Sequence, residues 1–279
     1  MSVSRRSLQI GLALCLAMLT QAAAGAQTQT QKENYKPTVG MPGKDAVWVP
    51  TSEAMVEKML DVAKVTPQDF VMDLGSGDGR MILAAAKRGA RGLGIEYNPE
   101  LVELSKEAAR KAGVADKAMF QQGDMYAADI SKATVLGLFL LPTNLEKLTS
   151  KFMALKPGSR IVANTFWVQD WAPDETHTLT ENCDNWCTAL LFIIPANVEG
   201  KWRVSGRNDL VLTQKYQMIE GTYTDDNGNR VPVKGRLRGD QLTISVGDNE
   251  YEGRVNGDRM EGAQKGMPNA EKVFAERAK

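Results

Sequence analysis

The 279-residue chain is poor in the side chains that build metal centres and has no excess charge of either sign. It holds three cysteines and a single histidine, His177, which are too few soft ligands for a closed zinc site. Lysine plus arginine and aspartate plus glutamate both number 34, so the formal net charge is zero. Because a nucleic-acid partner normally shows as a basic excess, we predict no nucleic acid among the partners and no bound metal.

The apolar run near the N-terminus is too short to span a membrane comfortably. Arg5 and Arg6 precede the run IGLALCLAML and then TQAAAGA, which together form a charged region, a hydrophobic region and a small-residue cleavage site before Gln27. We expect residues 1–26 to be a signal peptide that directs the chain to the periplasm or outside the cell. No stable membrane span would then remain. The alternatives are an uncleaved anchor and a cytoplasmic protein that starts at Met41.

The cysteines that would remain after removal of the signal peptide form one pair. Cys15 lies inside the signal peptide, whereas Cys183 and Cys187 lie four residues apart in the mature chain. An even pair in an exported chain is consistent with a disulfide, and the alternative is two small apolar side chains. His177 is better explained as a loop histidine with a local hydrogen bond than as a catalytic base.

Strand and helix patterns alternate after the polar stretch 27–46, which predicts a flexible lead-in. Strands are expected at 69–74, 91–96, 118–124, 133–141, 159–166 and 187–198, and helices at 51–65, 79–89, 99–113 and 142–158. The strands are nearly continuous apolar runs, which is typical of a parallel sheet covered by helices on both faces. We therefore predict an α/β fold, a doubly wound Rossmann-like sheet, over residues 47–198.

The pattern changes at about residue 199 to short alternating runs separated by glycine, asparagine and aspartate. The stretches GRLRGDQL at 235–242 and GRVNGDRM at 253–260 resemble each other, and Asn256-Gly257 is typical of a tight hairpin. We expect residues 199–279 to form a small antiparallel β extension, a meander or partial barrel. Its low interior bulk favours an extension that has no ligand of its own.

The stretch DLGSGDGR, Asp73 to Arg80, is dense in glycine and follows an apolar strand. A dinucleotide fold requires Gly-x-Gly-x-x-Gly, but position 80 is arginine, and the Gly-Lys-Ser/Thr end of a phosphate-binding loop is absent. S-adenosyl-L-methionine (SAM) brings an ammonium, a carboxylate and a sulfonium but no phosphate. Asp73 would repel a pyrophosphate but can pair with the amino-acid end of SAM, and Gly75 and Gly77 let the backbone approach closely.

Two more acidic residues end the next two predicted strands. Glu96 ends GLGIE, where an acid accepts both ribose hydroxyls, and Asp124 follows QQG, where an acid reads the adenine amino group beside Met125. Three acids at three successive strand ends, the first opening the glycine-rich loop, predict SAM binding. The predicted cofactor residues are Asp73, Gly75, Ser76, Gly77, Gly79, Glu96, Asp124 and Met125.

The segment VMDLGSGDGRMILAAAKRGARGLGIEYNPELVE resembles the class I, seven-β-strand SAM-dependent methyltransferases, a resemblance that extends over about residues 48–198. DLGSGDGR more narrowly resembles a bacterial and mitochondrial group, some of whose members methylate protein lysines. FLLPTNLEKL and FWVQDWAPD resemble segments that this group carries after its fourth and fifth strands. The resemblance implies the glycine-loop and acidic cofactor residues above and a lid formed by VWVPTS, with Thr51 a candidate contact. It does not cover the β-rich tail.

Methyl transfer from a sulfonium is an in-line displacement that an enzyme promotes mainly by positioning, which can supply about 7–11 kcal/mol. The signature Asn/Asp-Pro-Pro-Tyr of many amino-nitrogen methyltransferases is missing, because two leucines precede Pro142. The candidate acceptor pocket comprises Pro142, Asn144, Trp167, Asp170 and Trp171, since aromatic walls and a carboxylate would suit a cationic lysine. The alternative is that the tryptophans seal the edge of the core.

These patterns predict a SAM-dependent methyltransferase whose acceptor is a protein lysine or a small molecule. No residue is singled out as a catalytic base. The alternative function is an exported binding module on a methyltransferase-like fold that has lost catalysis and holds its partner through the β-rich tail.

Overall fold

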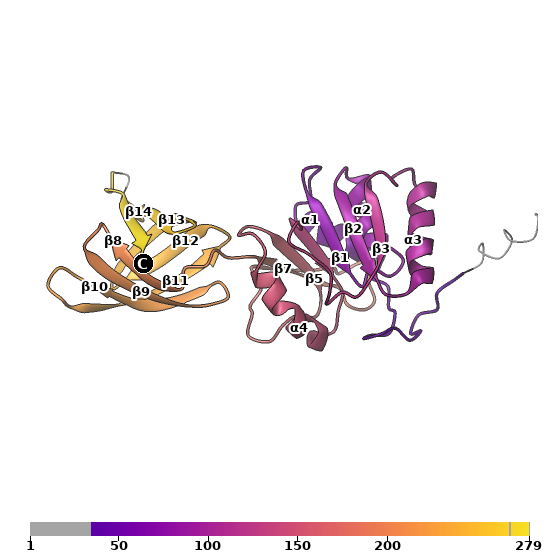
Figure 1. Cartoon of the computed structure of the whole chain (residues 1–279), viewed down its shortest axis with the longest axis horizontal. Helices are drawn as coiled ribbons and strands as arrows, with labels where there is room; N and C mark the ends of the chain where they lie inside the picture. Colours follow the sequence, from indigo (N-terminus) through magenta and orange to yellow (C-terminus); the bar gives the residue numbers. More distant parts are fainter. Residues whose placement is uncertain (1–34, 268, 279) are drawn as a thin grey trace, which may run out of the picture. The chain divides into compact units, whose positions relative to one another are not determined.

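The structure is a computed structural model that describes residues 35–267 and 269–278. The expected signal peptide and the first part of the expected lead-in lie outside the described residues. Within the described part of the chain, no helix has the length and apolar character needed to cross a membrane. An open sheet with helices comes first along the chain and a closed β-barrel follows it (Figure 1).

The first part is a seven-stranded sheet with the order β3-β2-β1-β4-β5-β7-β6. Its strands are β1 (Phe70–Leu74), β2 (Arg91–Glu96), β3 (Ala118–Gln122), β4 (Val135–Leu138), β5 (Arg160–Asn164), β6 (Glu175–Thr178) and β7 (Thr188–Ile193). Strands β1 to β5 run parallel, as their apolar sequences predict, whereas β7 is antiparallel to β5 and β6 is antiparallel to β7. The expectation of a parallel sheet is therefore wrong at this edge, because the chain passes from β5 to the edge strand β6 and returns as β7 between the two, antiparallel to both.

The described part of the chain has four α-helices, of which α1 precedes β1 and the other three connect strands, and each was predicted with wider bounds. They are α1 (Glu53–Val62), α2 (Arg80–Lys87), α3 (Pro99–Lys111) and α4 (Pro142–Met153). The Ser52 hydroxyl caps α1 by accepting a hydrogen bond from the Met55 amide at 3.2 Å. Helices α3 and α4 both begin at a proline, whose fixed φ suits the first helical position.

The helices cover both faces of the sheet, as predicted (Figure 1). Met59 of α1, Ile82 of α2 and Val102 of α3 belong to one buried apolar cluster, whereas Leu148 and Phe152 of α4 belong to another. The sheet therefore separates two cores, and α4 supplies the helical cover of the second face in the described structure.

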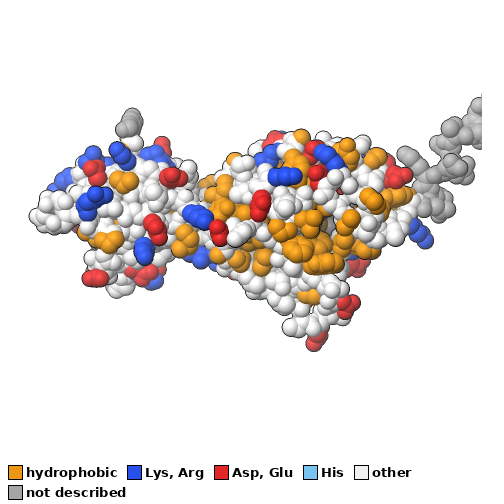
Figure 2. Space-filling model, turned by 90° about the horizontal axis from the view of Figure 1, so that it is seen from below, with side chains coloured by type: hydrophobic (Ala, Val, Ile, Leu, Met, Phe, Trp, Pro, Cys, Tyr) orange, Lys and Arg blue, Asp and Glu red, His pale blue; other side chains and the backbone are white. Residues whose placement is uncertain are grey.

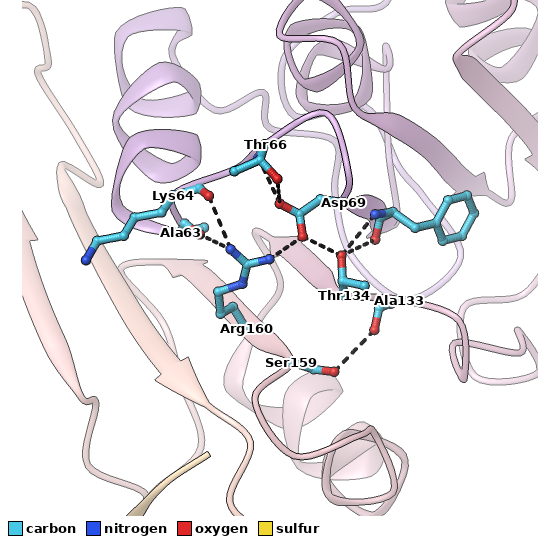
Figure 3. A network of polar contacts seen from close by, with 9 residues as sticks. Ala63, Lys64, Thr66, Asp69, Ala133, Thr134, Ser159 and Arg160 are labelled. Atoms are coloured by element: carbon cyan, nitrogen blue, oxygen red, sulfur yellow. Dashed lines mark hydrogen bonds and ion pairs between the residues drawn. The ribbon is translucent and has the colours of Figure 1, made fainter. Parts of the chain in front are cut away.

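A polar network ties together the strand ends opposite the glycine loop (Figure 3). The buried carboxylate of Asp69 pairs with the Arg160 guanidinium and accepts hydrogen bonds from the Thr66 amide at 2.8 Å and the Thr134 hydroxyl at 2.7 Å. Arg160 also donates to the Ala63 carbonyl at the end of α1, at 2.8 Å. Burial alone would raise the pKa of Asp69, but these donors and the Arg160 charge hold that pKa below its ordinary value.

The second part is a closed eight-stranded antiparallel barrel with the order β10-β11-β12-β13-β14-β15-β8-β9. Its strands are β8 (Gly200–Val204), β9 (Asn208–Lys215), β10 (Met218–Thr224), β11 (Arg230–Arg238), β12 (Gln241–Val246), β13 (Asn249–Asn256), β14 (Arg259–Gln264) and β15 (Val273–Arg277). The repeated stretches form the hairpins β11–β12 and β13–β14, as predicted. The expectation of a small extension is wrong, because β15 pairs with β8 and closes the barrel through a contact that no local pattern reveals.

The surfaces of the two parts differ in composition on the face shown in Figure 2. Hydrophobic side chains gather over the sheet part, whereas basic and acidic side chains are interspersed over the barrel (Figure 2). Leu141, after β4, and Trp186, before β7, are among the exposed large hydrophobic residues. Exposed apolar groups of this kind mark interaction sites when they are contiguous.

Replacing Asp69 with asparagine is expected to lower the free energy of unfolding by about 2–4 kcal/mol, because Arg160 loses its buried counter-charge. The depressed pKa means that the wild-type carboxylate stabilises the fold above its ordinary pKa of 3.8 and loses this effect as pH falls through the lower folded value. Urea unfolding at neutral pH measures the difference. Asp116→Asn, at an exposed position, is the control. Equal stability of Asp69→Asn and wild type would contradict the assignment.

Candidate active site

The carboxyl ends of β1, β2 and β4 open into a cavity of about 140 Å³. Its lining includes seven of the eight predicted cofactor residues, namely Asp73, Gly75, Ser76, Gly77, Glu96, Asp124 and Met125. Gly79 is the exception and precedes α2 with a φ of 81°. A Cβ atom at Gly79 would lie 2.6 Å from the Phe120 ring, so this glycine allows helix α2 to pack closely.

The glycine loop is held against the end of β2 by three hydrogen bonds. The amides of Gly75 and Ser76 donate to the Ile95 carbonyl at 2.8 and 3.0 Å, and the Gly77 amide donates to Glu96 Oε2 at 2.9 Å. Gly75 and Gly77 both have positive φ values, 76° and 54°, which a side chain would strain. The sequence folds into this turn because glycine stands where the backbone must be left-handed.

Asp73 is a buried carboxyl whose side chain faces two other acids. Burial raises the pKa of Asp73 to about 8, and the charges of Glu96 and Asp78 act in the same direction. Such a group is protonated near neutral pH unless a cation approaches it. The hydroxyl of Ser76 is also buried and has no hydrogen-bond partner among the described residues. The Asp73 carboxyl fits the ammonium of the amino-acid end of SAM, and the Ser76 hydroxyl fits its carboxylate.

Glu96 is oriented by the backbone on both of its oxygens. Oε2 accepts from the Gly77 amide and Oε1 accepts from the Asn98 amide, both at 2.9 Å. An ionised carboxylate has about four lone-pair sites, so capacity remains for the two ribose hydroxyls. The position of Glu96 at the end of β2 therefore suits the predicted ribose contact.

Asp124 makes a contact that sequence reasoning did not anticipate. Its Oδ2 lies 2.6 Å from Lys44 Nζ, and its Oδ1 accepts from the Tyr126 amide at 2.8 Å. The hydrogen bond from Lys44 lowers the pKa of Asp124 and raises the pKa of Lys44. Lys44 also lies over the Tyr97 ring, 5.0 Å from its centroid. Lys44 belongs to the predicted lead-in, and nothing in its local sequence distinguishes it from other polar residues.

Residues 41–51 line the cavity, and residues 47–51 among them belong to VWVPTS, the segment for which the family resemblance implies a lid. The Trp48 amide donates to the Met41 carbonyl at 2.9 Å, and the Trp48 indole lies against Gly77, where a Cβ atom would be 2.6 Å from Nε1. Arg80 donates to the Thr51 carbonyl at 2.5 Å and pairs with Asp78 at 2.6 Å. The arginine that excludes a dinucleotide motif therefore joins the glycine loop to the lid.

The five candidate acceptor residues do not line this cavity. Pro142 begins α4, and Asn144 donates to the Tyr126 hydroxyl at 2.8 Å. Trp167 stacks on Phe152 and Phe192, Trp171 stacks on Tyr216 with centroids 4.6 Å apart, and Asp170 lies 3.3 Å from Lys215 of the barrel. Both tryptophans therefore pack against other aromatic rings, in agreement with the alternative that they seal the edge of the core. Their part in acceptor binding stays a prediction.

A different aromatic group lies beside the cavity. Phe139 lines the cavity just after β4, stacks on Phe166 at 6.0 Å and contacts the Trp186 ring at 5.6 Å. Cys183 and Cys187 are joined by a disulfide, with an S–S distance of 2.08 Å, in the loop that carries Trp186. Trp186 has a φ of 55°, which is an outlier for a bulky residue, so the loop holds it in a specific position.

Comparisons with known proteins agree on the first part of the chain. Residues 73–175 match the family model of the ANTKMT methyltransferase domain. A protein-lysine N-methyltransferase of Saccharolobus islandicus is 39% identical over 150 residues, which cover 53% of this chain and 92% of that protein. The adenine nucleotide translocase lysine N-methyltransferase of Mus musculus is 35% identical over 128 residues, 45% of this chain and 56% of that protein.

A solved structure gives the same result for the fold. The crystal structure of an RNA methyltransferase from Salinibacter ruber in complex with S-adenosyl-L-homocysteine is 43% identical, with a TM-score of 0.50, and covers 54% of this chain and 96% of that one. The sheet, the glycine loop and these matches define a class I SAM-dependent methyltransferase. Within this class, the chain belongs to the ANTKMT family of protein-lysine methyltransferases.

The raised pKa of Asp73 predicts that SAM binding releases close to one proton at pH 7, because the ammonium of SAM favours the ionised carboxylate. Affinity for SAM is expected to rise from about pH 6 to about pH 7, above which an α-amino group begins to lose its own proton. Calorimetric titrations in buffers of different ionisation enthalpy count the protons. Asp73→Asn should bind SAM more weakly and release none. Wild-type binding without proton release would contradict the assignment.

Proposed function

We propose that this SAM-dependent methyltransferase transfers the methyl group to the side-chain nitrogen of a protein lysine. The observation that carries the proposal is the aromatic group of Phe139, Phe166 and Trp186 at the edge of the cofactor cavity. Aromatic faces attract a lysine ammonium and partly desolvate it. The naming of the archaeal and mouse relatives as lysine methyltransferases supports the same acceptor.

The chemistry requires a neutral amine in line with the methyl group. SAM, when bound, supplies an electrophilic methyl on a sulfonium. Residues Asp73 and Glu96 are placed to hold the amino-acid and ribose ends of the cofactor, which fixes the direction from which an acceptor must approach. An apolar surrounding disfavours the charged form of lysine and lowers its pKa. Phe139 and its neighbours therefore position the nitrogen, and the proton passes to solvent before the methyl group is transferred.

The acceptor class is tested by incubating the purified protein and tritiated SAM with an extract of the source cells. Label is expected in material that resists ribonuclease and is lost after proteinase treatment, with methyl-lysine in the acid hydrolysate. The zero net charge gives no support to an RNA acceptor. Label that ribonuclease removes would nevertheless overturn the proposal and favour the activity for which the Salinibacter ruber relative is named. Label in neither polymer would indicate a small-molecule acceptor.

The contribution of the aromatic group is tested at Trp186, which lies outside the cofactor cavity lining and is 41% exposed. Trp186→Ala is expected to lower kcat/KM for the labelled protein by roughly 5- to 30-fold, which corresponds to about 1–2 kcal/mol of cation–π attraction and packing. Affinity for SAM, measured by calorimetry, should not change. Trp186→Phe should restore most of the rate. A variant as active as wild type would exclude Trp186 from acceptor binding.

Export of the protein by residues 1–26 is a further part of the proposal. It rests on the order of charged, apolar and small residues at the N-terminus, and the disulfide Cys183–Cys187 supports it because disulfides persist in oxidising compartments. Mass spectrometry of the protein from its source cells is expected to find Gln27 at the N-terminus. A chain that begins at Met41 and stays in the cytoplasm would overturn the proposed export.

A further inference from the structure

The barrel contains a cavity of its own, of about 310 Å³. Leu210, Leu242, Ile244, Met260 and Ala275 line it and are each no more than 7% exposed. They come from four different strands, so the cavity lies in the interior that the barrel strands enclose and not between two neighbouring strands. Protein interiors are close-packed and rarely contain voids larger than a water molecule. A space of this size is therefore a feature that needs an explanation.

Packing fills one half of the barrel interior and leaves the other half open. Trp202, Leu212, Ile219, Leu237 and Val255 belong to the buried core of the barrel and do not line the cavity. The Trp202 indole is completely buried and donates to the Val198 carbonyl at 2.7 Å. Eight strands give an interior that side chains can just fill or that can hold one small ligand. In this barrel, side chains fill the interior at one end, and the other end has room for one small ligand.

Polar groups line the cavity on the side of the β8–β9 and β10–β11 turns. Arg207 and Asp226 belong to these turns and carry opposite charges. Glu252 and Glu261 also line the cavity, and their carboxylates pair with Lys265 at 3.2 Å and with Lys272 at 2.5 Å. Between Arg207 and Asp226 in sequence, Asn208 and Tyr223 also line the cavity, and the Asn208 amide donates to the Tyr223 hydroxyl at 2.7 Å. The Tyr223 hydroxyl then keeps its own proton, which it can donate to a ligand.

We propose that this cavity binds a small amphiphile with an apolar body and one uncharged, hydrogen-bonding head. At about 30 Å³ for each water-sized group, the space holds roughly ten non-hydrogen atoms. Its volume of about 310 Å³ lies at the lower end of the range typical of ligand pockets. The apolar body packs against Leu242, Ile244 and Met260, and the head accepts a hydrogen bond from Tyr223. The proposal is independent of methyl transfer and reverses the expectation that the β-rich tail has no ligand.

Calorimetric titration with 1-octanol, octanoate and octylammonium tests both the binding and the character of the head. The full protein is expected to bind 1-octanol at one site with a Kd on the order of 10–100 µM. The two charged analogues should bind at least about tenfold more weakly, since a charged head costs more than a hydroxyl to remove from water. Octanoate would also face the like charge of Asp226, and octylammonium that of Arg207. No saturable binding of 1-octanol by the folded protein would overturn the proposal, as would equal binding of all three compounds.

Variants locate the site. Ala275→Phe fills the cavity and should abolish binding of 1-octanol. Because the larger side chain can also disturb the fold, Tyr223→Phe provides a milder test. It removes the hydroxyl, and with it the hydrogen bonds to the ligand and to Asn208, with an expected three- to tenfold loss of affinity for 1-octanol and none for n-octane. Val211→Phe, at a position that is 42% exposed and outside the cavity lining, is the matched control and should bind as wild type does. Unchanged affinity in a folded Ala275→Phe protein would place the ligand elsewhere.

Discussion

The methyltransferase site depends on the attachment of the glycine loop to the end of β2. Two amides of the loop donate to the Ile95 carbonyl, and a third, from Gly77, donates to Glu96. These bonds turn the chain so that Asp73 and Glu96 face the same cavity, and they use backbone donors that would otherwise be unpaired. The carboxylate that is predicted to bind ribose therefore also fixes the loop that is predicted to hold the amino-acid end. Binding and local folding depend on the same side chain.

Two basic side chains, Lys44 of the lid and Arg80 of α2, pair with acids of a site that is otherwise acidic. Asp73, Glu96 and Asp124 end three adjacent strands, and burial together with the charges of Glu96 and Asp78 raises the pKa of Asp73. Lys44 offsets the charge of Asp124, and Arg80 offsets that of Asp78 while it binds the Thr51 carbonyl. The Asp73 carboxyl can then pair with a cation of the bound cofactor. A sulfonium cofactor with an ammonium group matches this distribution, whereas a pyrophosphate does not.

The parts of this structure that could be predicted are those that short sequence patterns determine. Apolar strands followed by helical periodicity located β1 to β5 and the four helices, and acids at strand ends identified Glu96 and Asp124. Contacts between segments that are distant in the chain leave no pattern in the local sequence. The antiparallel edge, the pairing of β15 with β8 and the lid lysine Lys44 all depend on chain segments that meet only in the folded protein. The tryptophans after β5 showed aromatic character but not the partner against which each one packs.

The segment between β5 and β6 contacts both the aromatic group and the barrel. At its start, Phe166 stacks on Phe139 beside the cofactor cavity, whereas further along Trp171 stacks on Tyr216 of the barrel. Asp174, whose side chain is 2% exposed, binds Arg236 of β11 at 2.8 Å. Only the Asp174 side of this pair is buried, since the Arg236 side chain is 44% exposed. Removal of Arg236 would leave a buried carboxylate without this partner, so the pair helps to hold this end of the segment. The segment therefore joins the aromatic group to the end of the barrel that carries the β9–β10 turn, opposite the end at which the β8–β9 and β10–β11 turns border the barrel cavity.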